Sequence, residues 1–154
     1  LAIIQYNACL RYSELFQELK YYEKNGKFKN MKNIEGKYFW TIREIKNSNQ
    51  EKDIFKTIPV HNSIVRMIEN KTIPNVFSNT KANDYIKELA KELDIEYGQR
   101  ITTHTIRHSK ITHLVSLGVS DRQVKMLSGH TSDSSFQGYN HDKVDLNNHS
   151  LPMD

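Results

Sequence analysis

Apolar residues recur at helical spacing along most of the chain, and this spacing predicts a largely helical protein. The pattern is clearest in 82–93, where apolar residues share one face of an amphipathic helix and Lys and Glu residues occupy a solvated face. The apolar residues of this face are Tyr85, Ile86, Leu89 and Leu93. Helices are also predicted for 1–9, 10–19, 61–69 and 103–117, and for a segment that begins at Ser120.

Small and polar residues mark several helix ends. Ser13 is placed to cap the second helix, because a serine side chain accepts hydrogen bonds from the first backbone N–H groups of a helix. Gly118 ends the helix that precedes it, since glycine readily adopts the left-handed conformation found there. Ser120 and Gln123 have the spacing of a capping box and begin the next helix. Residues 128–131 are then expected to form a tight loop.

Aromatic and β-branched residues over 37–45 predict a β-strand. Turn-forming residues follow at 47–50, and a second strand is expected over 53–58, ended by Pro59. These segments form a hairpin, so the expected fold class is α+β, mostly α-helical with a small antiparallel hairpin or sheet. The stretch 20–37, rich in Lys, Asn and Gly, is expected to be a loop or irregular arm.

The bulk properties narrow the class of protein. The 154 residues, 37% of them hydrophobic and 26% charged, are enough for one globular domain with a core. No apolar run approaches the length of a membrane span, so no membrane partner is expected. The single cysteine, Cys9, excludes an internal disulfide and fits a reducing, cytoplasmic compartment. The formal net charge of +4 is a mild indication of nucleic-acid binding.

The stretch 104–139 holds the densest group of chemically active side chains. His104 and Arg107 are three residues apart, so they share one face of a helix. His130 follows a Ser-Gly pair, and Tyr139 comes nine residues after it. A guanidinium clamps phosphate oxygens, imidazoles donate hydrogen bonds or move protons, and a phenol can act as a nucleophile. The set therefore fits chemistry on a phosphate group.

This order of His-x-x-Arg, Gly-His and Tyr resembles the C-terminal signature of the tyrosine recombinases, the phage integrase family. That family also carries an upstream arginine in a segment like G-x-R-x-S-E-L, and Arg11 occupies that place in CLRYSEL. Its catalytic lysine lies in a β-hairpin, where Lys46 matches best and Lys52 stays open as an alternative. The resemblance runs from about Leu10 to Tyr139, nearly the whole chain, and implies the catalytic-domain fold of the family.

The resemblance also implies a role for each matching residue. Arg11 and Arg107 would neutralise the scissile phosphate and stabilise its five-coordinate transition state. Tyr139 would attack that phosphate in line, which gives a 3′-phosphotyrosyl intermediate and a free 5′-hydroxyl.

Three further residues would move protons or donate hydrogen bonds. Lys46 would protonate the leaving oxygen, His104 would act as general acid/base near the tyrosine, and His130 would donate to a phosphate oxygen. The covalent link keeps the phosphodiester energy, so strand exchange would require no cofactor, neither ATP nor a metal. The sequence also lacks Cys-x-x-Cys and His-Glu-x-x-His zinc motifs.

The expected function is that of a site-specific DNA recombinase (integrase) for integration or excision of a phage or other mobile element. Its partner would be double-stranded DNA, bound as a tetramer by the full-length protein. Leu1 opens within an apolar pattern, and the family has a DNA-clamping domain ahead of the catalytic one. We therefore expect 1–154 to be a single catalytic domain, a fragment that is monomeric without DNA.

Other interpretations of the same residues stay open. A type IB topoisomerase has similar nucleophile chemistry but no exchange between duplexes, and a non-catalytic relative would only bind DNA. The helices flanking Gly118 have helix-turn-helix spacing, which could read a major groove, although in the family such a pair supports the active site. His108, His113 and His141 are expected to pack or to lie at the surface, and Lys56 to contact a phosphate or solvent.

Overall fold

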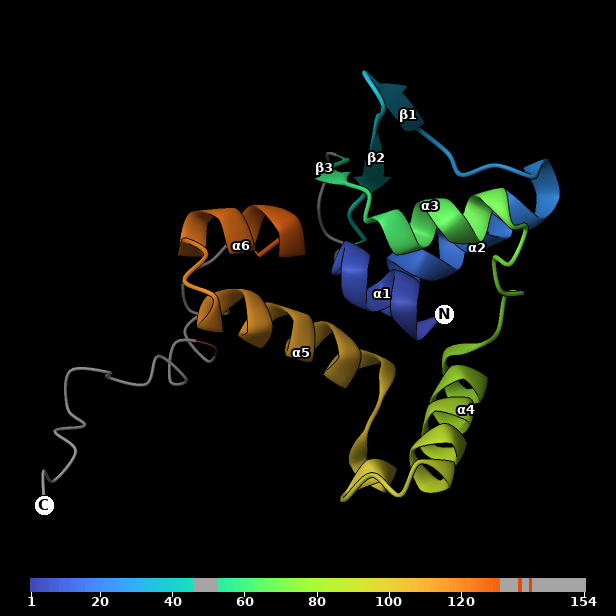
Figure 1. The fold of residues 1–154 in the computed structure, drawn as a ribbon, viewed down its shortest axis with the longest axis vertical. Coiled ribbons are helices and arrows are strands. Elements are labelled where there is room, and N and C mark those ends of the chain that lie inside the picture. Colours follow the sequence, from blue (N-terminus) through green and yellow to red (C-terminus); the bar gives the residue numbers. More distant parts are fainter. Residues whose placement is uncertain (46–52, 131–135, 137–138, 140–154) are drawn as a thin grey trace, which may run out of the picture.

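The computed structural model describes residues 1–45, 53–130, 136 and 139 (Figure 1). Lys46, Lys52 and His141 lie outside these described residues. The described helices are α1 (Ala2–Ala8), α2 (Tyr12–Asn25), α3 (Asn62–Glu69), α4 (Asn79–Glu92), α5 (Thr103–Ser116) and α6 (Asp121–Ser128), with a short 3₁₀ helix, η1 (Gly98–Arg100). The described strands are β1 (Met31–Ile34), β2 (Lys37–Arg43) and β3 (Phe55–Pro59). The predicted α+β fold, mostly helical with a small antiparallel sheet, is confirmed.

The strands form an antiparallel sheet in the order β1-β2-β3, and the predicted β2–β3 hairpin is confirmed. Trp40 at the centre of β2 pairs with Met31 of β1 and with Ile58 of β3. The prediction of a loop over 20–37 is wrong, because the stretch holds the end of α2 and all of β1. Most residues of β1 are exposed, so this edge strand is held by backbone pairing rather than by an apolar face. The hydrophobic periodicity of the sequence therefore does not predict the strand.

Helix α2 is capped at Arg11, and the prediction of Ser13 as its cap is wrong. The backbone of Arg11 is extended, and its N–H donates to the Glu14 carboxylate at 2.9 Å. Glu14 therefore reaches back from the first turn of the helix, as the acidic residue of a capping box does. Just before this point, Cys9 has a left-handed φ of 51°, which ends α1 and turns the chain directly into α2.

The main core lies between the sheet and helices α1, α2 and α3. Trp40 is fully buried at its centre, 4.5 Å from the Phe28 ring, and its indole N–H donates to Glu18 at 3.2 Å. The aliphatic residues of this core are Ile4, Leu10, Leu15, Leu19, Ile42, Ile58 and Ile64. A smaller apolar cluster joins α5 to α6 and includes Phe136 and Tyr139. The position of Tyr139 in this cluster ties a candidate site residue to the packing of the domain.

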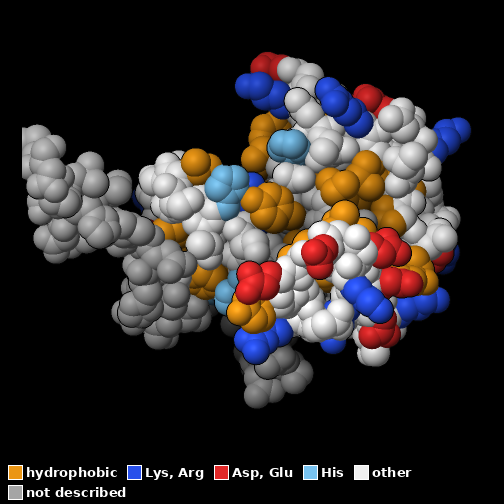
Figure 2. Space-filling view, turned by 60° about the horizontal axis from the view of Figure 1, so that its bottom comes forward, with side chains coloured by type: hydrophobic (Ala, Val, Ile, Leu, Met, Phe, Trp, Pro, Cys, Tyr) orange, Lys and Arg blue, Asp and Glu red, His pale blue; other side chains and the backbone are white. Residues whose placement is uncertain are grey.

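Helix α4 lies at the far end of the molecule from the sheet (Figure 1). It packs through small residues, since Ala82 and Ala90 are buried and a side-chain carbon at Gly98 would lie 2.7 Å from Cβ of Ala90. The face that the sequence marks as apolar is largely exposed, with 52% exposure at Leu89 and 62% at Leu93. Figure 2 brings this end of the molecule forward and shows apolar side chains lying among charged ones.

Helices α5 and α6 follow the sequence closely. Gly118 is left-handed, with φ 73°, just after α5. Ser120 caps α6, where its hydroxyl lies 3.4 Å from the backbone N of Gln123 and donates to the Gln123 side chain at 2.8 Å. Helix α5 packs on α1 and α4, and α6 packs on α5 and β3. Among the described residues, none of the helices combines the length and apolar character that a bilayer crossing requires.

A buried ion pair joins α2 to β3. The Lys56 ammonium donates to the Glu14 carboxylate at 3.0 Å, and both residues are buried. The expectation that Lys56 contacts solvent is therefore wrong, and its contact with a phosphate stays a prediction. Burial lowers the pKa of Lys56, whereas the adjacent Glu14 carboxylate raises it and favours the charged form.

Lys56→Met is expected to lower the free energy of unfolding by about 3 kcal/mol, because it removes a counter-charge from a buried carboxylate. Adding Glu14→Gln to this variant should recover most of the loss, since no unpaired charge is then left in the core. The measurement is urea unfolding of each variant. Lys37→Met, at an exposed position of the same sheet, is the matched control and should change stability by less than about 0.5 kcal/mol. Equal losses at positions 56 and 37 would contradict the buried pair as a source of stability.

Candidate active site

Arg107 is the most deeply buried of the candidate residues, with 2% of its surface exposed. It points from α5 into the gap between the end of α1 and the end of α6. One terminal nitrogen donates to the backbone oxygen of Cys9 at 2.9 Å, and the other donates to the backbone oxygen of Ser128. The guanidinium is thus held from two sides, and its remaining N–H groups are kept in a set direction.

Both acceptors are backbone carbonyls at helix ends. Cys9 follows α1, and Ser128 is the last residue of α6, before left-handed Gly129 with φ 70°. The last carbonyls of a helix have no partner within the helix and carry partial negative charge. A permanent cation between two such ends therefore satisfies them and joins the two helices to α5.

Arg11 stands at the start of α2, and its side chain is 29% exposed. Its guanidinium donates to the Glu14 carboxylate at 3.1 Å, while the other oxygen of this carboxylate accepts from Lys56. Glu14 therefore holds Arg11 through both its backbone N–H and its side chain. The sequence places Glu14 only in the expected helix, and the residue spacing does not reveal its contact with Lys56.

His130 follows α6, and its Nδ1 lies 2.7 Å from the Ser128 hydroxyl. Its pKa is lowered to about 4, first by burial and then by the charges of Arg107 and Arg11. The ring is consequently neutral near pH 7. It stands edge-on to the Tyr139 ring, with 5.7 Å between the ring centroids.

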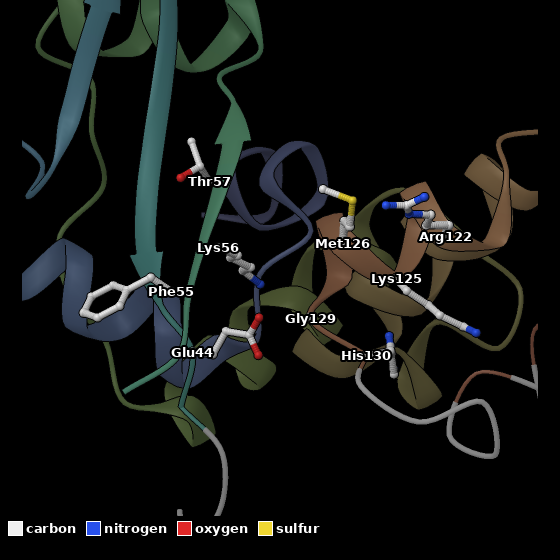
Figure 3. Close-up of a pocket in the computed structure, with 9 residues that line it drawn as sticks. All are labelled: Glu44, Phe55, Lys56, Thr57, Arg122, Lys125, Met126, Gly129 and His130. Carbon is white, nitrogen blue, oxygen red and sulfur yellow. The ribbon is translucent and has the colours of Figure 1, made fainter. Parts of the chain in front are cut away.

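A cleft of about 580 Å³ opens between β3 and α6 beside His130 (Figure 3). Figure 3 shows Glu44 and Lys56 on one side of it and His130 and Lys125 on the other. A side-chain carbon at Gly129 would lie 2.8 Å from the Glu44 carboxylate, so this position needs glycine both for its positive φ and for the close approach. Among the described residues, the cleft is lined by Glu44, Phe55, Lys56, Thr57, Arg122, Lys125, Met126, Gly129 and His130.

Tyr139 meets the α5 imidazoles through His108. The phenol oxygen lies 3.2 Å from Nε2 of His108, which in turn lies 2.6 Å from Nε2 of His104. The rings of His108 and Tyr139 are 4.9 Å apart between centroids. The expectation that His108 serves only packing or the surface misses this contact. The spacing of His104 and His108 could have predicted that the two imidazoles adjoin, because residues four apart share one face of a helix.

Burial controls the acidity of these groups. It raises the pKa of Tyr139, while the nearby charges of Arg107 and Arg11 lower it. Burial lowers the pKa of His104 and of His108, and the charge of Arg107 lowers both further. In this state the phenol keeps its proton and both imidazoles are neutral near pH 7.

The structure brings four of the candidate residues, His104, Arg107, His130 and Tyr139, into one cluster with His108. Arg11 lies close enough for its charge to lower the pKa of both His104 and His130. Lys46 and its alternative Lys52 fall outside the described residues, so the structure describes no place for the catalytic lysine. His113 is exposed on α5 and shares a hydrogen bond with the Tyr6 hydroxyl at 2.6 Å.

The chain is similar in sequence or in fold to several known proteins. The chain is 46% identical to tyrosine recombinase XerD of Listeria monocytogenes over 56 residues. This stretch covers 36% of the chain and 18% of that protein. It is 33% identical over 87 residues to XerD of Staphylococcus haemolyticus, or 52% of this chain and 30% of that protein. The matched region thus spans less than a third of the length of either relative.

The fold matches that of XerH site-specific recombinase in the crystal structure of its post-cleavage complex with palindromic difH substrate. The TM-score is 0.63 over 91% of this chain and 40% of that one, and at 17% identity this likeness concerns the fold alone. Residues 2–145 match the pattern described as the phage integrase family. Because that match covers nearly the whole sequence, the chain belongs to the phage integrase family, the tyrosine recombinases.

Proposed function

We propose that the chain is the catalytic domain of a site-specific DNA recombinase that cleaves and rejoins DNA through a 3′-phosphotyrosyl intermediate. The observation that carries this proposal is the surroundings of Tyr139. Its hydroxyl lies within hydrogen-bonding distance of a neutral imidazole and in the field of two guanidinium groups. A phenol with a base beside it and cations to neutralise its target is equipped to attack a phosphate.

Arg107 and Arg11 form the clamp in this proposal. The two helix ends orient Arg107, and its remaining N–H groups bind non-bridging oxygens of the scissile phosphate. Arg11 is held by Glu14 at the rim and adds the second positive charge. The five-coordinate transition state carries more negative charge than the ground state, so the fixed cations stabilise it more strongly.

Two histidines and a lysine complete the set. The Ser128 hydroxyl donates to the Val124 backbone oxygen at 2.7 Å, and it can turn to donate to Nδ1 of His130 instead. The neutral His130 ring then carries its hydrogen on Nε2 and donates it to a phosphate oxygen. The resemblance gives His104 the role of general acid/base for the tyrosine, and His108 lies between it and the Tyr139 hydroxyl. Lys46 protonates the 5′ oxygen as its bond to phosphorus breaks. The phosphotyrosyl link retains the energy of the broken bond, so rejoining reverses these steps without ATP or a metal.

The partner in this proposal is double-stranded DNA, held by a tetramer of the full-length protein. The chain itself is one catalytic domain of that protein and is monomeric without DNA. The biological setting that we propose is integration or excision of a phage or other mobile element. Recombination assays on the DNA that flanks the gene would distinguish this setting from chromosome resolution.

Tyr139→Phe in the full-length protein should abolish the covalent protein–DNA adduct and leave DNA binding nearly unchanged, because only the attacking oxygen is removed. The measurement is a denaturing gel with a nicked duplex made from the DNA that flanks the gene. Tyr97→Phe is the control and should form the normal adduct, since Tyr97 is 67% exposed at the start of η1. An adduct of normal yield from the Tyr139 variant would remove this residue from the mechanism.

Arg107→Lys should lower the single-turnover cleavage rate by about 10²- to 10³-fold, since one ammonium group cannot bind two helix-end carbonyls and a phosphate together. Arg66→Lys, at an exposed position of α3, should cleave at the normal rate. Thermal unfolding of both variants separates loss of catalysis from loss of fold. Normal cleavage by folded Arg107→Lys protein would show that the paired N–H donors of the guanidinium are not needed for catalysis.

Lys46→Ala should stall cleavage of ordinary DNA but should slow cleavage much less when the leaving group is a 5′-thiolate, which needs no proton. Parallel assays of Lys52→Ala on the two substrates decide between these lysines. Rescue by the thiolate at Lys52 but not at Lys46 would move the general acid to Lys52.

A further inference from the structure

The hydrogen bonds around His108 single it out on α5. Its Nε2 atom lies 3.2 Å from the Tyr139 hydroxyl and 2.6 Å from Nε2 of His104. One ring nitrogen therefore stands between the phenol and the histidine that the family signature marks. This arrangement follows from the fold, because His104 and His108 are one helical turn apart and Tyr139 packs across them from the segment after α6.

An imidazole nitrogen carries either a hydrogen or a lone pair, so Nε2 of His108 cannot accept and donate at the same time. While it holds a lone pair, it accepts the hydrogen bond from the Tyr139 hydroxyl. The 2.6 Å contact between the two Nε2 atoms needs one hydrogen, so Nε2 of His104 then carries that hydrogen and donates it to Nε2 of His108. The lone pair on Nε2 of His108 is thus the acceptor that both neighbours face.

We propose that His108 is a catalytic residue that takes the proton from Tyr139, with His104 as its hydrogen-bond partner; this rests on the proposed recombinase function. In the first step the O–H bond of Tyr139 breaks and an N–H bond forms at Nε2 of His108. The freed electron pair on the phenol oxygen forms the bond to phosphorus, and the bond from phosphorus to the 5′ oxygen breaks. The proton stays on Nε2 of His108, and the hydrogen bond from His104 breaks, since both Nε2 atoms then carry a hydrogen.

The charges around His108 make this transfer depend on bound DNA. His104 and Arg107 face it from α5, and Tyr139 and His130 face it from the segment after α6. Burial and the guanidinium of Arg107 lower the pKa of His108 and so disfavour its charged form. A phosphate anion seated on Arg107 offsets that positive charge and strengthens the imidazole as a base. The proton therefore leaves Tyr139 when a phosphate is in place to be attacked.

The test compares His108→Gln with His108→Phe in the full-length protein, using single-turnover adduct formation on the nicked flanking duplex. Glutamine keeps a polar group that can bond to Tyr139 but cannot carry the proton, and phenylalanine keeps the ring shape alone. Both variants should slow adduct formation by about 10²- to 10⁴-fold, the range for a lost general base. His113→Gln, at an exposed position of α5 four residues beyond Ser109, is the matched control and should react normally.

The pH profile gives a second readout that a structural role would not change. In the unchanged protein the rate should rise with pH and then level off once His108 is neutral. In both His108 variants it should keep rising by about tenfold per pH unit through the neutral range, because the phenol must then lose its proton to the solvent. Thermal unfolding and DNA binding, measured on the same samples, show whether each variant is folded.

Three results would overturn the inference. Normal rates in both variants would show that His108 takes no part in the reaction. A normal rate in His108→Gln alone would show that it only positions Tyr139. Absence of an adduct from the unchanged protein would overturn the proposed function and this inference with it, whereas a Tyr139-dependent adduct with unaffected His108 variants would overturn this inference alone.

Discussion

The guanidinium of Arg107 is the contact on which the geometry of the site depends. It belongs to α5, yet it binds the end of α1 and the end of α6. These two ends carry the chain toward Arg11 on one side and His130 on the other. Because the cation satisfies carbonyls that helices leave without partners, the same bonds stabilise the fold and set the spacing of the site.

Glu14 makes a comparable connection on the other side of the site. Its carboxylate accepts from the backbone and side chain of Arg11 and from Lys56 of β3, so the sheet is tied to the residue that stands at the rim of the site. A buried carboxylate is unfavourable unless it is paired and hydrogen-bonded, and here it is both. The position of Arg11 is consequently sensitive to changes in a strand that lies outside the cluster of histidines.

Local signals account for what the sequence could predict. Caps such as Ser120 and the apolar spacing of α5 act over a few residues, and the structure follows them. One failure is local, since the capping box of Arg11 and Glu14 replaces the predicted Ser13 cap. The other failures depend on partners outside the local segment. Lys56 is a buried ion-pair partner because of a carboxylate 42 residues away, and His108 joins the site because of a phenol 31 residues away. The edge strand β1 depends on pairing with β2, and Leu89 of α4 is exposed because that helix packs through alanines.

Tyr139 belongs to the apolar cluster that joins α5 to α6, together with Ile111, Val115 and Val124. Its neighbouring residues are therefore under two selective constraints, the packing of the two helices and the freedom of the phenol to react. A substitution that loosens the cluster to free the phenol also weakens the contact between two helices, and one that tightens it restrains the reacting group. Substitutions in this cluster are therefore not expected to raise both the cleavage rate and the stability of the fold. Sequence drift in this family member is expected to be slowest in the few apolar positions around the tyrosine, although none of them takes part in the chemistry.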